Sequence, residues 1–290
     1  MREFNEQTLT QAAVERVAST PDPRLRKILQ SLIEHLHGFV RDTQPTWEEW
    51  RTGIQFLTQT GQMCDGKRQE FILLSDTLGV SMLVDLLNYG KQPGSSESTV
   101  LGPFFAEGAP EIQIGGSIVT AGTPGETAVV TGSVKATDGR PVANAILDVW
   151  ESGTDGLYDV QKAEGTNLRG RLRTDSSGRF WFRAIIPTSY PVPTDGPVGA
   201  MLKASGRHPM RPGHLHFAIN APGYKQLITH LFTSGDEYLD SDAVFGVKES
   251  LVVQYQRIAS AEKAAEFGVA SPFWHVNYDF VLIAQQPCAI

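Results

Sequence analysis

The chain has 290 residues, 41% of them hydrophobic and 20% charged, so it can fold around a sizeable core as one large or two ordinary domains. Its formal net charge is −7 and it has no basic tract, which argues against nucleic acid or an anionic membrane as a partner. With no secretory signal, no apolar run near the ~20 residues of a membrane span, and only two cysteines, Cys64 and Cys288, we expect a cytoplasmic protein without a disulfide framework or a zinc–thiolate site.

The first third of the chain has the apolar spacing of α-helices. The stripe from Leu25 to Val40 follows the i, i+3, i+4, i+7 rule, with Asp22 as the expected N-cap and Pro23 as the first helical residue. A capping box at Thr46–Glu49 predicts a second helix. Two more helices are predicted at about 67–77 and 80–89.

A linker is expected at 90–99, where glycine, proline and serine gather, and beyond it the period changes to two. Short strands separated by turn residues predict an antiparallel β-sandwich. The expected fold is therefore α+β, with a helical N-terminal domain and linker over 1–95 and a β-sandwich domain over 96–290. The predicted strands are 128–135, 143–150, 180–186 and 214–219.

The histidines carry the first chemical signal. No GxGxxG, P-loop or GxSxG motif is present. His214 and His216 stand two apart on a predicted strand, so both imidazoles face the same side and could share a metal. Two surface histidines on an exposed sheet face would have the same spacing.

Two tyrosines and an arginine extend this signal. Tyr158 lies in a glycine-containing loop, and Tyr190 stands on a stiff backbone next to prolines. Phenolate is a hard anionic ligand that suits a trivalent cation, so two phenolates and two imidazoles would make a non-haem iron(III) site. Arg211, three residues before His214, could stabilise negative charge on a substrate. Loop packing of the tyrosines and a surface arginine are the simpler alternatives.

Four motifs in order resemble those of the intradiol ring-cleavage dioxygenases. They are Arg211-Pro-Gly-His-Leu-His-Phe217, Val149-Trp150 with Gly156-Leu-Tyr158, Ile186-Pro187 with Tyr190-Pro191, and Leu101-Gly-Pro-Phe104. The resemblance spans nearly the whole chain. It implies one iron(III) per subunit, bound by Tyr158, Tyr190, His214 and His216, with Tyr190 also taking a proton. It further implies that Arg211 stabilises the activated ring of an aromatic diol or triol, which O₂ then attacks.

The resemblance also bears on the substrate. His230 stands where catechol-cleaving members usually have glutamine, and Tyr238–Val247 is similar to the hydroxyquinol branch. That branch implies cleavage of benzene-1,2,4-triol to 3-hydroxy-cis,cis-muconate, with Asp76 pairing the third hydroxyl unless its side chain caps a helix or faces solvent. The substrate-facing positions implied are Leu73, Asp76, Leu101, Gly102, Pro103, Val192, Pro193, His230 and Val244.

Other functions stay open on the sequence alone. The same chemistry could act on catechol or a chlorocatechol. The run 132–145 is similar to transthyretin-like binding domains, which would make the sandwich a non-catalytic module. A zinc hydrolase would need a carboxylate ligand that is not evident at the usual spacing. The family resemblance implies a homodimer formed by the helical domain, with a lipid bound there as a possibility.

Overall fold

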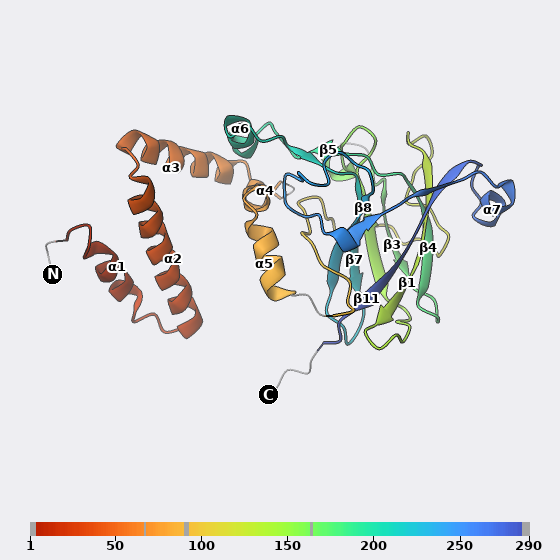
Figure 1. Cartoon of the computed structure of the whole chain (residues 1–290), viewed down its shortest axis with the longest axis horizontal. Helices are drawn as coiled ribbons and strands as arrows, with labels where there is room; N and C mark the ends of the chain where they lie inside the picture. Colours follow the sequence, from red (N-terminus) through yellow and green to blue (C-terminus); the bar gives the residue numbers. More distant parts are fainter. Residues whose placement is uncertain (1–3, 67, 90–92, 163–164, 286–290) are drawn as a thin grey trace. The chain divides into compact units, whose positions relative to one another are not determined.

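The computed structural model describes residues 4–66, 68–89, 93–162 and 165–285. It divides into two compact units, Met1–Gln59 and Thr60–Ile290. Figure 1 shows the elements of both units along the chain. The α-helices are α1 (Leu9–Val17), α2 (Pro23–Thr43), α3 (Trp47–Gln62), α4 (Glu70–Thr77), α5 (Val80–Asn88), α6 (Pro197–Ala204) and α7 (Ala261–Glu266), with short 3-10 turns η1 (Asp159–Gln161) and η2 (Glu249–Leu251).

The two predicted helix starts are confirmed by their hydrogen bonds. The carboxylate of Asp22 accepts from the backbone N–H groups of Arg24 and Leu25 at 2.7 and 3.2 Å. At the second start, Thr46 N–H donates to the Glu49 carboxylate at 2.7 Å and Glu49 N–H donates back to the Thr46 hydroxyl at 3.2 Å. Both contacts satisfy amide groups that the first helical turn leaves without partners.

One helical prediction needs adjustment, and one helix was not predicted. The third helix begins at Glu70 rather than near Lys67, which lies outside the described residues. Helix α1 was not predicted, because its few apolar residues form too short a stripe for periodicity to reveal. The fourth predicted helix, 80–89, matches α5.

The second unit contains two packed sheets. The strands are β1 (Thr127–Ala136), β2 (Ile146–Trp150), β3 (Arg169–Arg173), β4 (Arg179–Ile185), β5 (Tyr190–Pro191), β6 (Met210–Arg211), β7 (His214–Asn220), β8 (Leu227–Thr233), β9 (Val252–Val253), β10 (Gln256–Ile258) and β11 (Phe273–Leu282). One sheet has the order β10-β11-β1-β4 and the other β3-β2-β7-β8-β9, while β5 and β6 form a separate pair. Buried side chains of both large sheets meet in one core, as expected for a sandwich.

The α+β class is confirmed, and two details of the sheets differ from the prediction. The pairs β1–β11 and β8–β9 are parallel, so the sheets are mixed. Parallel neighbours need a long connection between them, which local turn residues cannot reveal. The second strand begins at Ile146 rather than Ala143, because Asn144 takes a left-handed φ of 55° in the preceding turn.

The described part of the predicted linker is packed against the sandwich. Residues 90–92 lie outside the described residues, but Ser96 N–H donates to Val281 O at 3.0 Å and Thr99 N–H donates to Ile228 O at 2.9 Å. These bonds attach 96–99 to β11 and β8, so the chain enters the sandwich along a defined path.

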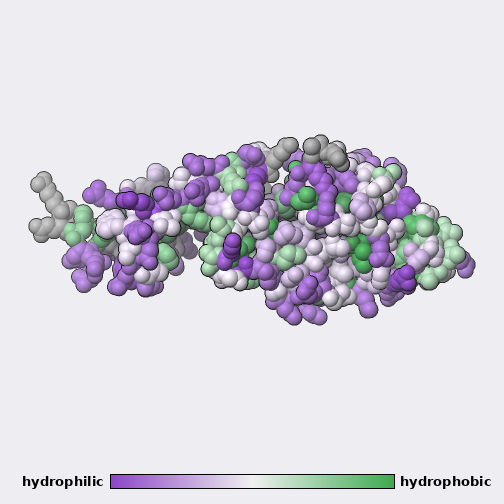
Figure 2. Space-filling model, turned by 90° about the horizontal axis from the view of Figure 1, so that it is seen from above, coloured by the Kyte–Doolittle hydropathy of each residue, from purple (hydrophilic) through white to green (hydrophobic). Residues whose placement is uncertain are grey.

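No helix within the described ranges is long and apolar enough to cross a membrane. The face of the molecule in Figure 2 is mostly hydrophilic, with hydrophobic patches between the polar residues. The cytoplasmic location expected from the sequence stays a prediction.

Candidate metal centre

Alternation along β7 separates its histidines from the sandwich core. Leu215 and Phe217 are buried in the core, so His214 and His216 project from the opposite face of the five-stranded sheet. In the β-register His216 stands opposite His230 on β8. On its other side His216 stands opposite the last residue of β2, Trp150, as the pairing of β2 with β7 requires.

Local structure brings both predicted tyrosines to this face. Tyr158 precedes η1, and its N–H donates to the side chain of Gln161 at 2.9 Å. Tyr190 lies in β5 directly opposite Arg211 in β6. Gly156, two residues before Tyr158, has a φ of +76°. A β-carbon at this position would lie 3.2 Å from the β-carbon of Tyr190. Glycine therefore permits both the turn and the close approach of the two tyrosine segments.

Four side-chain atoms from these segments converge. The Tyr158 oxygen lies 2.9 Å from the Tyr190 oxygen and 2.8 Å from Nε2 of His216. Nε2 of His214 lies 3.1 Å from Nε2 of His216 and 3.4 Å from the Tyr190 oxygen. All four side chains are buried. The structure thus brings together the four residues that the sequence singled out as ligands.

The spacing of these atoms suits a single metal ion. Nitrogen and oxygen ligands held at ~2.0–2.1 Å from one ion stand about 2.9–3.4 Å from each other. Nδ1 of His214 lies 2.7 Å from the carbonyl oxygen of Pro212. A proton on Nδ1 makes that contact a hydrogen bond and leaves the lone pair of Nε2 directed at the cluster, which is the usual arrangement of a metal-binding histidine.

Electrostatics agree with this fit. Burial, with the positive charge of Arg211, lowers the pKa of His214 well below its ordinary value, and burial also lowers that of His216. Both imidazoles are therefore neutral and able to donate a lone pair. Burial raises the pKa of Tyr158 and of Tyr190, so ionised phenol oxygens here need a cation beside them.

Stacked aromatic rings hold two of the four side chains. Trp150 stacks on His216 with ring centroids 4.6 Å apart and planes 13° apart. Phe104 stacks on Tyr158 at 4.6 Å and 21°. The stacked rings restrict the rotation of His216 and Tyr158 and exclude water from them. In such an apolar surrounding, electrostatic interactions with a cation are stronger than in water.

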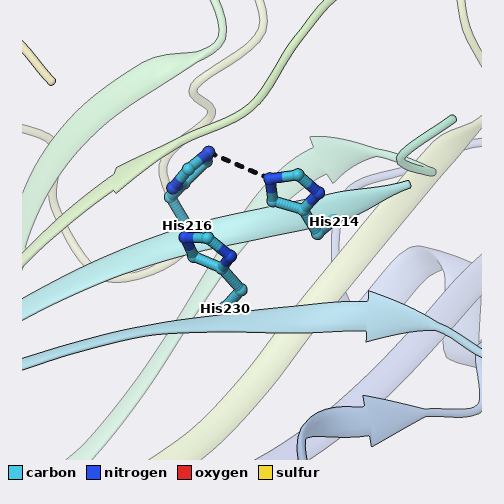
Figure 3. Close-up of side chains that lie close together, drawn as sticks. All are labelled: His214, His216 and His230. Carbon is cyan, nitrogen blue, oxygen red and sulfur yellow. Dashed lines mark hydrogen bonds between the residues drawn. The ribbon is translucent and has the colours of Figure 1, made fainter. Parts of the chain in front are cut away.

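His230 adds a third imidazole on the same face. Figure 3 shows it on β8, next to His214 and His216 on β7. Ligand atoms of the three rings lie within 4.8 Å of one another. Neither ring nitrogen of His230 has a well-formed hydrogen bond among the described groups. Burial lowers its pKa, and the backbone of Val100 opposes that shift. A neutral imidazole therefore lies beside the cluster.

Arg211 reaches the cluster from β6. Its Nη1 lies 3.1 Å from Nε2 of His214 and donates to the Tyr190 oxygen at 3.4 Å. Its Nε donates to a carboxylate oxygen of Asp242 at 3.0 Å. Asp242 lies in the run 238–247 noted in the sequence, but sequence reasoning gave it no role, because no spacing rule links it to an arginine 31 residues away.

A cavity of about 480 Å³ is lined by Leu157 and Pro191, the chain neighbours of the two tyrosines, although none of the four cluster residues lines it. Its walls include Phe104, Gly156 and Val160, with Arg68 and Asp195 at a more polar part. Four of the residues predicted to face a substrate line it: Leu73, Pro103, Val192 and Pro193. A largely apolar cavity of this size can take one aromatic ring.

The other predicted substrate residues lie outside the lining of this cavity. A β-carbon at Gly102 would stand 3.5 Å from Cε1 of His216, which places Gly102 against the cluster. Val244 is buried beside Asp242. Leu101, in contrast, is 36% exposed.

Asp76 is buried, which excludes a solvent-facing side chain. It stands three residues after Leu73 on α4, so both side chains project from the same side of the helix. Burial raises the pKa of Asp76, the hydroxyl of Ser81 and the charge of Arg211 lower it, and the charge of Asp242 raises it. The carboxyl therefore lies close to the Arg211–Asp242 pair.

Comparison with known proteins agrees with this geometry. The family model "Dioxygenase" matches residues 100–284, and "Catechol dioxygenase N terminus" matches residues 22–96. The chain belongs to the intradiol ring-cleavage dioxygenases. It is 50% identical over 283 residues to hydroxyquinol 1,2-dioxygenase from Rhizobium sp. (strain MTP-10005), covering 96% of each chain. It is 49% identical to 6-chlorohydroxyquinol 1,2-dioxygenase from Cupriavidus pinatubonensis, covering 97% of this chain and 99% of that one.

Solved structures of intradiol dioxygenases share the whole architecture. A hydroxyquinol 1,2-dioxygenase from Pseudomonas putida DLL-E4 matches with a TM-score of 0.89 at 50% identity, over 97% of this chain and 99% of that chain. Catechol 1,2-dioxygenase from Acinetobacter radioresistens matches with a TM-score of 0.86 at 26% identity, over 100% and 96%. This intradiol dioxygenase is therefore an enzyme of a non-haem iron family, and the predicted resemblance is confirmed. A purely binding sandwich is excluded as its function.

Proposed function

We propose that this enzyme cleaves hydroxyquinol with O₂, using one iron(III) per subunit held by Tyr158, Tyr190, His214 and His216. The main support for this proposal is that two phenol oxygens and two imidazole nitrogens converge, with separations of 2.8–3.4 Å between them. Both oxygen atoms enter the product, and the bond between the two adjacent hydroxyl-bearing carbons breaks. The product is 3-hydroxy-cis,cis-muconate, the enol form of maleylacetate.

An iron(III) ion in this ligand set would supply Lewis acidity and a template for two adjacent hydroxyl groups. The chain supplies the rest. Tyr190 takes a proton from a substrate hydroxyl at its phenol oxygen, which is buried in the cluster. Arg211, with Nη1 3.4 Å from that oxygen, stabilises the negative charge left on the ring.

The cavity walls fit the ring of the substrate. Leu73, Pro103, Val192 and Pro193 present apolar surface, which binds the ring and keeps water out. His230 places a neutral imidazole beside the cluster and can bond a substrate oxygen. Gly102 allows the ring to approach His216, and Val244 is held beside Asp242 by its N–H.

Asp76 accounts for a preference for the triol. The hydroxyl of Ser81 bonds this buried carboxyl, and the third hydroxyl of hydroxyquinol can supply a further hydrogen bond. Catechol would leave the carboxyl without that partner. Relatives that are 50% and 49% identical over nearly the whole chain are named for hydroxyquinol and 6-chlorohydroxyquinol, which supports the same substrate class here.

Catechol or a chlorocatechol is the second candidate substrate. The fold match to catechol 1,2-dioxygenase, with a TM-score of 0.86, favours a common ring-binding geometry. The two candidates differ only in the ring substituent that Asp76 meets. Initial rates on hydroxyquinol and catechol at equal concentration therefore separate them directly.

The helical unit supports a homodimer. Helix α2 exposes six large apolar side chains along one stripe, from Leu25 to Val40, with exposed fractions of 45–61%. An exposed apolar stripe of this length marks an interaction surface, and a second copy of the chain offers a matching one. A lipid chain bound along this stripe would be an additional occupant.

The proposed function is tested with the purified enzyme. We expect one iron per subunit, a reddish colour from tyrosinate bound to iron(III), and a shift of the visible band when hydroxyquinol is added without O₂. With O₂, hydroxyquinol should be consumed faster than catechol, with one O₂ taken up per ring opened. Iron-free protein that cannot be loaded would contradict the metal site, and a clear preference for catechol would contradict the substrate.

A further inference from the structure

Asp242 satisfies four donors with one carboxylate. One oxygen accepts from Nε of Arg211 at 3.0 Å and from the N–H of Val244 at 3.3 Å. The other accepts from Nη2 of Arg211 at 3.3 Å and from the N–H of Gly246 at 2.8 Å. A carboxylate has about four acceptor positions, so all of them are used.

This pair is buried and closely packed. The side chains of Arg211 and Asp242 are 4% and 2% exposed. A β-carbon at Gly246 would lie 2.9 Å from Nη2 of Arg211 and 3.2 Å from the Asp242 carboxylate. Neither side chain can rotate away without leaving a buried charge uncompensated, which is costly.

The pair also determines which nitrogen of the Arg211 guanidinium faces the metal centre. The Asp242 carboxylate occupies the Nε and Nη2 edge of Arg211, as two parallel bonds require. The remaining nitrogen, Nη1, is thereby directed at Tyr190 and His214. The backbone of Arg211 is fixed separately by its pairing with Tyr190 in the β5–β6 ladder.

We propose that Asp242 is a positioning residue of this dioxygenase: its carboxylate aims Nη1 of Arg211 at Tyr190 and His214 in the metal centre, and it fixes the backbone of Val244 beside the pair. This inference rests on the proposed function, because it acts through Arg211. Its negative charge also balances the guanidinium, so that the arginine would oppose less strongly a cation held by the four cluster residues. One loop carboxylate thus holds both the charge-stabilising guanidinium and the backbone of its own loop at Val244 and Gly246.

The test is a double-mutant cycle of Asp242→Asn and Arg211→Gln. Asparagine keeps the size of the side chain but removes its charge and half of its acceptors. We expect Asp242→Asn alone to lower kcat on hydroxyquinol by about 10–100-fold, with a smaller change in KM. In the Arg211→Gln background the same change should lower kcat less than about threefold, since no guanidinium remains to position.

The matched control is Asp148→Asn. Asp148 forms a similar pair with Arg171, through Nε at 2.7 Å and Nη2 at 2.9 Å, and contacts none of the cluster residues. We expect it to change thermal stability without changing kcat. If Asp242→Asn does not fold, Asp242→Glu, which keeps the charge and moves it by one methylene, takes its place in the cycle.

Iron content and the visible band are measured in every variant. Positioning predicts that Asp242→Asn retains both while kcat falls. Additive losses in the double mutant, or unchanged kcat in Asp242→Asn, would overturn the proposal. If the unmodified enzyme fails to cleave hydroxyquinol at all, the proposed function fails instead, and the cycle on catechol then decides the role of Asp242 by the same criterion.

Discussion

The phenol oxygen of Tyr158 lies 2.8 Å from Nε2 of His216, although the two residues are 58 positions apart in the chain. One comes from the loop before η1 and the other from β7, the central strand of the five-stranded sheet. Two buried groups are held in contact at a point where Tyr190 and His214 also meet. The proposed metal centre depends on this arrangement.

Replacing Tyr158 by phenylalanine should weaken iron binding at least tenfold and remove or shift the visible band. The variant keeps the ring that stacks on Phe104 but loses the oxygen that lies between Tyr190 and His216. Iron content and absorbance of the purified protein measure the effect.

Tyr255→Phe is the matched control. Tyr255 is a buried tyrosine of the sandwich core, so removing its hydroxyl group should leave the iron content and the visible band unchanged. A Tyr158→Phe variant with normal iron content and an unaltered spectrum would exclude Tyr158 as a ligand.

Asp76→Ala should reduce kcat/KM on hydroxyquinol by about 10–100-fold and leave catechol turnover nearly unchanged. The carboxyl is buried beside the Arg211–Asp242 pair, so only a substrate with a third hydroxyl gains a bond from it. Steady-state rates on both substrates give the ratio. Asp76→Asn, which keeps one acceptor, should lose less, and equal losses on both substrates would refute the pairing.

Glu151 should make the stability of the enzyme depend on pH. Burial raises the pKa of Glu151 to about 8 against an ordinary value of 4.5, while the N–H of Ile185 opposes the shift. Between these pH values the folded state keeps a proton that the unfolded chain has lost. The free energy of unfolding therefore falls as the pH rises through this window and levels off above it.

Glu151→Gln removes the titration and serves as the comparison. Glutamine resembles the neutral acid, so above pH 8 the variant should be more stable than the unmodified enzyme, by on the order of a few kcal/mol. Urea unfolding of both proteins at pH 6 and pH 9 measures the difference. The same pH dependence in both proteins would show that Glu151 is ionised in the fold.

Leu32→Lys should convert the proposed dimer into monomers. Leu32 is 51% exposed in the middle of the α2 stripe, and a charge there would have to be desolvated in an apolar interface. Light scattering after size exclusion gives the mass. Glu34→Lys, an exposed position outside the stripe, is the control and should stay dimeric. A monomeric unmodified protein would refute the interface.

Local features of the fold were predictable because they depend on neighbouring residues. Asp22 and Pro23 mark the start of α2, and the alternation of His214 and His216 with Leu215 and Phe217 marks β7. Strand β11 and its parallel pairing with β1 were not predictable, because that pairing joins residues about 146 positions apart.

The proposed ligands could be named from the sequence because their residue types and motifs are unusual in combination. The role of Asp242 could not be predicted, because it depends on the tertiary contact between this loop aspartate and Arg211. The same holds for the stacking of Trp150 on His216, which arises from the register of β2 with β7.

By itself, the sequence determined the helical and β portions of this chain, the turns that need glycine, and the two tyrosines and two histidines that suit a hard cation. Only the tertiary structure decided that their oxygen and nitrogen atoms stand about 3 Å apart, that Asp76 is buried, and that Asp242 aims Arg211. The reason is physical: periodicity and turn chemistry act between neighbours, whereas distances within the site follow from how sheets and loops pack.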